Sequence, residues 1–213
     1  MTAQTHSIKY LYKKIKKDIE KRLEEFSESF KNINNDDLFA ELSFCTFTPQ
    51  SKARSCWKCI EDLRSSGLLY HADADELKCN ITGVRFHNNK SRYVVKNREL
   101  FMSMDFKKFI LENSKDIIKL RKWLVLNIKG YSFKEASHFL RNVGYGSDIA
   151  ILDRHILKNL VLYRVIEGIP KAINEKTYLE IEDKMKVFSK DINIPMHHLD
   201  IVMWYKQTGE IFK

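Results

Sequence analysis

IKGYSFKEA, residues 128–136, lies between two segments whose apolar residues recur at helical spacing. Downstream of the stretch, positions i, i+3, i+4 and i+7 of one helical face are occupied by Ala136, Phe139, Leu140 and Val143. Two helices joined by a tight glycine-containing turn can direct backbone N–H groups at a nucleic-acid phosphate without carrying base information. The stretch predicts a helical hairpin over 121–143, with Gly130, Tyr131 and Ser132 as candidate DNA-contacting residues.

The composition favours helices. The chain has 213 residues, 44% of them hydrophobic, but only 3 Pro and 7 Gly. A turn-rich all-β fold would need more Gly and Pro, and a disordered chain would have fewer apolar residues. The length suits one large domain or two small ones.

The net charge is +9 and the sequence pI is about 9.2. Such an excess attracts polyanions, among which nucleic acid is the first candidate, although ordinary solubility charge is an alternative. An amphipathic helix is predicted over 5–32, with the lysines at 13, 14, 16 and 17 on its solvated face.

Periodicity predicts further helical segments along the chain. A short helix and turn are expected over 33–47, and an irregular connector over 71–82. Longer helices are expected over 49–66 with Thr48 as N-cap, from Asn88 onward, and over 104–113, 116–128, 154–166, 177–188 and 196–207. We expect an all-α protein with two interleaved lobes: 1–40 with 145–213, and 41–144.

Four cysteines are present, and Cys56 and Cys59 form a C-x-x-C motif within one predicted helix. Such a motif occurs in zinc and redox sites, but buried thiols are favoured here and no iron–sulfur pattern is present. The sequence has no apolar run of membrane-spanning length, so a soluble intracellular protein of the cytoplasm or nucleoid is expected.

Asp153 lies 19 residues after Lys134. With this spacing, the sequence resembles the helix–hairpin–helix DNA glycosylase superfamily. It is most similar to the small archaeal-type 8-oxoguanine DNA glycosylase family in four stretches: KEASHFLRNVGY at 134–145, AILDRHIL at 150–157, GVRFHNNKSRYVV at 83–95 and WYKQTGEIFK at 204–213. Ser132 departs from the superfamily pattern, which usually has a second glycine there.

The resemblance implies a two-lobe fold with the active site in the cleft between the lobes. It implies that Lys134 attacks the anomeric carbon of a flipped nucleotide, expels the base and cuts the strand by β-elimination. Asp153 would stabilise positive charge on the sugar or help to deprotonate the lysine. Without the resemblance, Lys134 would be interpreted as an exposed helix lysine and Asp153 as an N-cap.

Five further residues are candidates for base recognition. The family ends in a lysine whose terminal carboxylate helps to recognise the oxidised base, and this chain ends in Lys213. Trp204 can stack on a base or belong to the core. Asn88 and Asn89 can fill the gap left by the flipped base or act as turn residues, and Phe86 is a candidate wedge.

The expected partner is double-stranded DNA containing 8-oxoguanine, bound by a monomer, with no membrane partner, no metal and no cofactor. Two alternatives remain: a glycosylase for another oxidised base, and a non-catalytic helix–hairpin–helix DNA-binding protein. The latter would need neither Lys134 nor Asp153.

Overall fold

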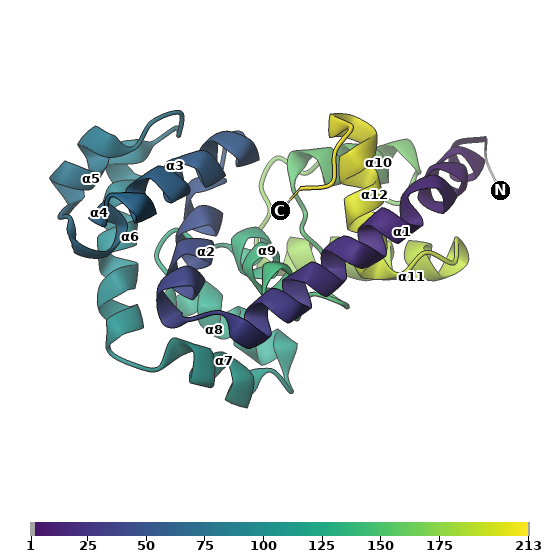
Figure 1. Ribbon diagram of the computed structural model, residues 1–213. Helices are drawn as coiled ribbons and strands as arrows, with labels where there is room; N and C mark the ends of the chain where they lie inside the picture. Colours follow the sequence, from purple (N-terminus) through teal and green to yellow (C-terminus); the bar gives the residue numbers. More distant parts are fainter. Residues whose placement is uncertain (1–2, 213) are drawn as a thin grey trace. The chain divides into compact units, whose positions relative to one another are not determined.

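The computed structural model describes residues 3–212, with side chains from residue 5 onward, as helices joined by short connections (Figure 1). Within these bounds no strand occurs, which confirms the all-α prediction. The helices are α1 Ala3–Asn32, α2 Asn35–Phe47, α3 Ala53–Ser65, α4 Leu68–His71, α5 Ala74–Asn80, α6 His87–Met102, α7 Phe106–Asn113, α8 Ile117–Asn127, α9 Phe133–Asn142, α10 Arg154–Leu162, α11 Glu175–Asp191 and α12 Met196–Thr208.

The helices belong to two compact units, described separately below. The first unit combines the chain up to Ser29 with the chain from Leu140 onward, and within it α10 and α11 both pack against α12. The second unit runs from Phe30 to Phe139, and within it α2 contacts α3, α6 and α7.

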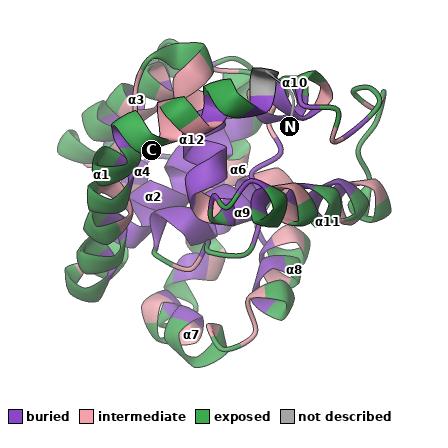
Figure 2. Ribbon diagram, turned by 90° about the vertical axis from the view of Figure 1, so that its right-hand side faces the viewer, coloured by how far each residue is buried: buried purple, intermediate pink, exposed green. Residues whose placement is uncertain are grey.

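Helix α2 forms the centre of the second unit. All its residues from Leu38 to Phe47 are buried, as the purple ribbon of Figure 2 shows. A helix buried on every side has no amphipathic period, which explains why periodicity predicted only a short helix and turn here. The helix begins at Asn34, whose Oδ1 accepts the N–H of Asp37 at 2.8 Å.

The predicted helix start at Thr48 is wrong. Thr48 is the C-cap of α2, and its backbone N–H donates to the carbonyl of Phe44 at 3.1 Å. Its hydroxyl donates back to the carbonyl of Cys45 at 3.0 Å and caps no following N–H group. Helix α3 begins only at Ala53, after a turn in which Gln50 has φ +56°.

Two further expectations are corrected. The segment 71–82 is not an irregular connector, because it contains α5, capped by Asp73 through bonds from the N–H groups of Asp75 and Glu76 at 2.9 Å. Only Leu77 is buried in this helix, so no apolar period marked it. Asn88 and Asn89 lie within the first turn of α6, not in a break before it.

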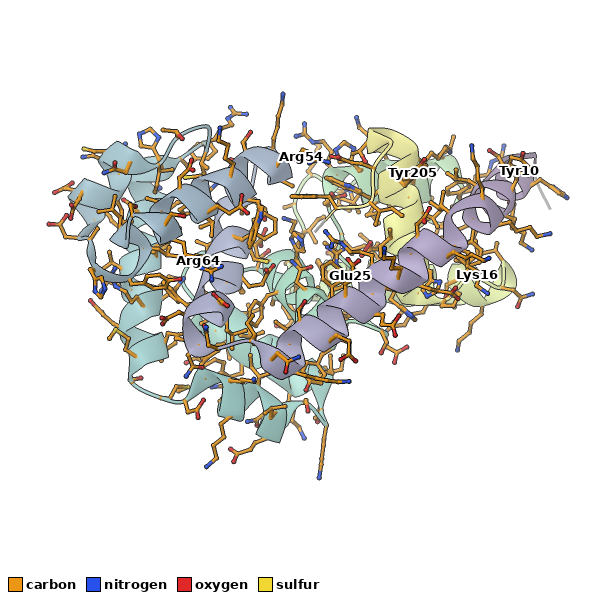
Figure 3. All side chains as sticks on the ribbon, in the orientation of Figure 1. Tyr10, Lys16, Glu25, Arg54, Arg64 and Tyr205 are labelled. Carbon is orange, nitrogen blue, oxygen red and sulfur yellow. The ribbon has the colours of Figure 1, made fainter. Side chains whose placement is uncertain are left out.

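Helix α1 has the predicted amphipathic pattern. Its apolar residues Ile8, Ile15, Ile19 and Phe26 are buried, whereas the lysines at 13, 14, 16 and 17 are exposed. Figure 3 labels Tyr10 and Lys16 on this helix, and 75% of Tyr10 is exposed. Among residues 3–212, no helix is both long enough and apolar enough to cross a bilayer.

Candidate active site

The predicted helical hairpin is present, and its turn belongs to the second unit. Helix α8 ends at Asn127, and α9 begins at Phe133. Gly130 in the turn has φ +85°, and a Cβ atom there would lie 2.7 Å from Cδ2 of Tyr93. The turn therefore requires glycine both for its backbone conformation and for the close approach of the Tyr93 ring.

Two of the proposed DNA-contacting residues already have partners inside this unit. The buried Tyr131 donates its phenol hydroxyl to the carbonyl of Leu42 at 2.9 Å, and its N–H to Ile128 O at 3.3 Å. The N–H of Ser132 donates to Oε2 of Glu135 at 3.0 Å. A phosphate could contact these N–H groups only by sharing or replacing the existing partners.

Ser132 forms part of a capping box at the start of α9. The Glu135 carboxylate accepts both the backbone N–H and the hydroxyl of Ser132, the S-x-x-E arrangement of helix N-termini. Ser132 is not among the residues with positive φ. Glycine is thus not needed at this position, which accounts for the departure from the superfamily pattern.

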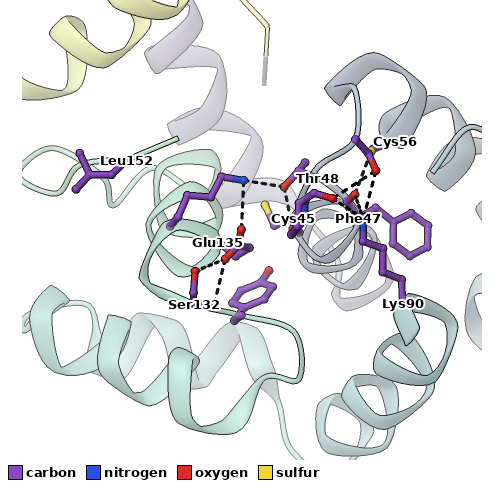
Figure 4. A network of polar contacts seen from close by, with 12 residues as sticks. Cys45, Phe47, Thr48, Cys56, Lys90, Ser132, Glu135 and Leu152 are labelled. Carbon is purple, nitrogen blue, oxygen red and sulfur yellow. Dashed lines mark hydrogen bonds and ion pairs between the residues drawn. The ribbon is translucent and has the colours of Figure 1, made fainter. Parts of the chain in front are cut away.

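Lys134, one residue before Glu135, is not the freely exposed helix lysine of the alternative interpretation. Its side chain is only 20% exposed. The amine Nζ lies 3.1 Å from Oγ1 of Thr48 and 3.3 Å from Oε1 of Glu135 (Figure 4). Because the Thr48 hydroxyl donates its proton to Cys45 O, its oxygen acts as the acceptor toward Lys134. The amine is therefore held from two sides.

A second lysine of this unit, Lys90, is 4% exposed. Its Nζ donates to Phe47 O at 2.7 Å, to Pro49 O at 2.8 Å and to Ser51 Oγ at 3.3 Å. Burial, together with the positive charge of Lys134, lowers the pKa of Lys90 to about 8.

The C-x-x-C cysteines lie beside this network and are free thiols. Cys56 and Cys59 are buried, as predicted, and Sγ of Cys56 donates to Phe47 O at 3.2 Å. Burial raises the pKa of Cys56 to about 11, so the thiol is unreactive near neutral pH. The part of the chain that the structure describes contains no group of three or more His, Cys, Asp or Glu side chains arranged to hold a metal ion.

In the first unit, Asp153 caps α10. Its Oδ1 accepts the N–H of Ile156 at 2.8 Å, as its place before a helical segment predicted. Asp200, which is buried, has its pKa raised to about 6 by burial, and the negative charge of Asp153 adds to this shift. Arg141 acts in the opposite direction, with Nη1 at 3.6 Å from Oδ1 of Asp200. Asp153 is thus a rigidly held carboxylate next to a second acidic group.

Trp204 lies on α12 in the same unit and is half-buried. Its ring meets that of His155 edge to face, with centroids 5.1 Å apart and planes at 90°. Its neighbours Leu199, Val202 and Met203 are buried. Its indole Nε1 is also buried and has no hydrogen-bond partner. Trp204 is therefore neither fully a core residue nor fully exposed.

The remaining candidates of the second unit lie at the start of α6. Phe86 occupies the N-cap position with φ +60°, and 52% of its side chain is exposed. Asn88 and Asn89 follow and are exposed. These three residues form one exposed group, while Lys213 lies outside the described residues.

Sequence analysis missed three residues of the lysine network: Thr48, Lys90 and Glu135. The S-x-x-E spacing from Ser132 could have identified Glu135 as a capping residue. No local signal identifies Thr48 and Lys90, because their partners lie 86 and 39–43 residues away in the sequence.

Comparisons with known proteins identify the family of this chain. A family model described as "8-oxoguanine DNA glycosylase" matches residues 19–194. The chain is 46% identical over 210 residues to the 8-oxoguanine DNA glycosylase/AP lyase of Fusobacterium nucleatum, covering 98% of this chain and 97% of the relative. It is also similar to the crystal structure of the Methanocaldococcus jannaschii 8-oxoguanine glycosylase/lyase in complex with a 15mer DNA containing 8-oxoguanine, with TM-score 0.88, 36% identity and full coverage of both chains. The crystal structure of the Thermotoga maritima 8-oxoguanine DNA glycosylase matches with TM-score 0.87 and 30% identity, covering 98% of each chain.

Proposed function

Because this chain belongs to the 8-oxoguanine DNA glycosylase family, we propose that it excises 8-oxoguanine from double-stranded DNA with the amine of Lys134 and then cuts the strand. The observation that carries the proposal is the placement of this amine, which belongs to a side chain only 20% exposed and is held by Thr48 and Glu135. Most lysines are exposed, which makes a lysine held in this way a candidate for a functional role.

Lys134 is the nucleophile of the proposed reaction. The uncharged amine attacks the anomeric carbon, the base leaves with the bonding electrons, and the nitrogen loses a proton. The carboxylate oxygen of Glu135, at 3.3 Å, is a suitable acceptor for that proton. The sugar ring then opens: the nitrogen lone pair forms the C=N bond of the Schiff base while the C1′–O4′ bond breaks and O4′ takes a proton. The Schiff base acidifies the proton on C2′, and its removal with β-elimination of the 3′ phosphate breaks the strand.

Asp153 has two roles in the proposal. Its carboxylate stabilises the positive charge that develops on the sugar as the base departs. The same group caps α10, and this bond at 2.8 Å fixes the carboxylate in one place. A carboxylate held in this way needs little reorganisation when charge develops.

Four further residues are proposed to contact the flipped base or the gap that it leaves. The half-buried Trp204, next to His155, stacks on the base. The exposed Phe86, with Asn88 and Asn89 beside it, enters the DNA where the base has left. Since a single chain supplies all of these residues, we propose that the protein acts as a monomer.

Borohydride trapping tests the proposal. The protein is incubated with a duplex containing 8-oxoguanine and reduced, which converts a Schiff base into a permanent protein–DNA adduct. We expect an adduct with the wild type and none with Lys134→Ala. The matched control is Lys129→Ala, an exposed lysine of the same hairpin, which should retain the adduct.

The lesion panel in the same assay separates the alternatives. Adduct formation with an oxidised pyrimidine but not with 8-oxoguanine would assign another substrate. No adduct with any lesion, despite tight DNA binding, would make the protein a non-catalytic DNA-binding module.

A further inference from the structure

Lys90 is a buried cation that the proposed reaction does not use. It is 4% exposed, and in the described part of the chain its donors meet three neutral oxygen atoms and no carboxylate. Burying a charged amine without an anionic partner is costly, so such a lysine calls for an explanation.

The three acceptors of Lys90 all belong to the turn that follows α2. The carbonyls of Phe47 and Pro49 point at the same amine, and Ser51 contributes its hydroxyl (Figure 4). Ser51 Oγ also accepts the N–H of Arg85 at 2.9 Å, which ties this turn to the segment before α6. Lys90 therefore fastens residues 47–51 in one conformation.

Thr48 lies within the 47–51 turn that Lys90 holds. Lys90 binds the carbonyl of the residue before Thr48, Phe47, and the carbonyl of the residue after it, Pro49. The Thr48 hydroxyl donates to Cys45 O at 3.0 Å and accepts from Lys134 at 3.1 Å. The conformation of this turn, which Lys90 holds, sets the position of the Thr48 oxygen. It therefore also sets one of the two contacts of the Lys134 amine.

We propose that Lys90 is a positioning residue for the reaction, which holds the 47–51 turn so that Thr48 orients the Lys134 amine. The inference rests on the proposed role of Lys134 as nucleophile. Lys90 itself does not contact DNA in this account.

The test combines three variants with single-turnover trapping on duplex DNA containing 8-oxoguanine. Lys90→Met removes the charge and all three hydrogen bonds. Thr48→Val removes only the hydroxyl next to Lys134. We expect each to lower the trapping rate by roughly 10- to 100-fold, while DNA affinity stays within about twofold. If Lys90 acts through Thr48, the double variant should be little slower than the slower single variant.

A conservative variant and a matched control separate positioning from mere stability. Lys90→Arg keeps donors for the carbonyls of Phe47 and Pro49 and should trap faster than Lys90→Met. The matched control is Lys107→Met, since Lys107 likewise donates to two carbonyls, at 2.9 and 2.8 Å, but holds residues 31 and 33.

The outcomes distinguish this inference from the proposed function. A wild type that traps through Lys134, with Lys90→Met trapping at the same rate, would overturn the positioning role alone. Equal rate losses in Lys90→Met and Lys107→Met would likewise overturn it, because both would then reflect stability. If Lys90→Met does not fold, unimpaired trapping by Thr48→Val refutes the inference. Adduct formation by Lys134→Ala would instead refute the proposed function.

Discussion

The two roles assigned to Asp153, helix cap and catalytic carboxylate, can be separated by one pair of substitutions. Asparagine is as good an N-cap as aspartate, so Asp153→Asn keeps the bond to the N–H of Ile156, which is 2.8 Å long in the native protein. Asp153→Ala loses that bond. Both remove the charge. We expect Ala to cost about 1 kcal/mol of stability and Asn only a few tenths.

These values translate into measurable differences. For a chain of this length, about 1 kcal/mol lowers the melting temperature by roughly 2–4 °C, so Ala and Asn should be distinguishable by thermal denaturation. In single-turnover excision both should be slower than the wild type by roughly 100- to 1,000-fold, because both lack the carboxylate that faces developing positive charge.

The control is another capping aspartate. Asp105 caps α7 by accepting the N–H of Lys108 at 3.1 Å, and it has no role in the proposed chemistry. Asp105→Asn should excise 8-oxoguanine at the wild-type rate. If Asp153→Asn were also as fast as the wild type while Asp153→Ala was slow, the residue would be a cap only, and its catalytic role would be refuted.

Three further predictions concern stability. Gly130→Ala should lose about 2 kcal/mol or more in chemical denaturation, because alanine at φ +85° is strained and its Cβ would lie 2.7 Å from Tyr93; a loss below about 0.5 kcal/mol would contradict this. Tyr131→Phe removes the buried hydroxyl that donates to Leu42 O at 2.9 Å and should lose about 1–2 kcal/mol in the same assay, with trapping unchanged; slower trapping would instead give the phenol a part in the reaction. Burial lowers the pKa of His198 to about 4, so between its unfolded value of 6.5 and about 4 the unfolded chain binds a proton that the folded chain does not. The free energy of unfolding therefore falls as the pH drops, and His198 accounts for about 2 kcal/mol of this fall at pH 5. Between pH 7 and pH 5 the His198→Gln variant should lose less stability than the wild type by about that amount. Equal losses in the two proteins would show that other groups dominate.

Local patterns predicted much of the fold. The amphipathic α1 and the second hairpin helix, α9, could be identified because one face of each is apolar over several turns. The extent of α2 could not, since burial on all sides removes the period. Helix α5 has one buried residue and so had no period to detect.

For the candidate site, sequence reasoning identified Lys134 and the cap formed by Asp153, because motif spacing and capping positions are local properties. It could not find Thr48 or Lys90. Their contacts join segments that are distant in the sequence. In addition, a threonine before a proline is typical of a helix start, so Thr48 was interpreted as an N-cap and not as a partner of Lys134. Which neighbour holds the amine is decided by packing, which no local pattern contains.

Phe86 has a consequence for engineering. A phenylalanine at φ +60° raises the energy of the native backbone by roughly 1 kcal/mol, and glycine would relieve this. The native protein is thus slightly less stable than a glycine variant would be, but it carries an exposed aromatic ring at the start of α6. A screen for thermostability alone would select Phe86→Gly, and in doing so would discard the ring that we propose enters the damaged duplex.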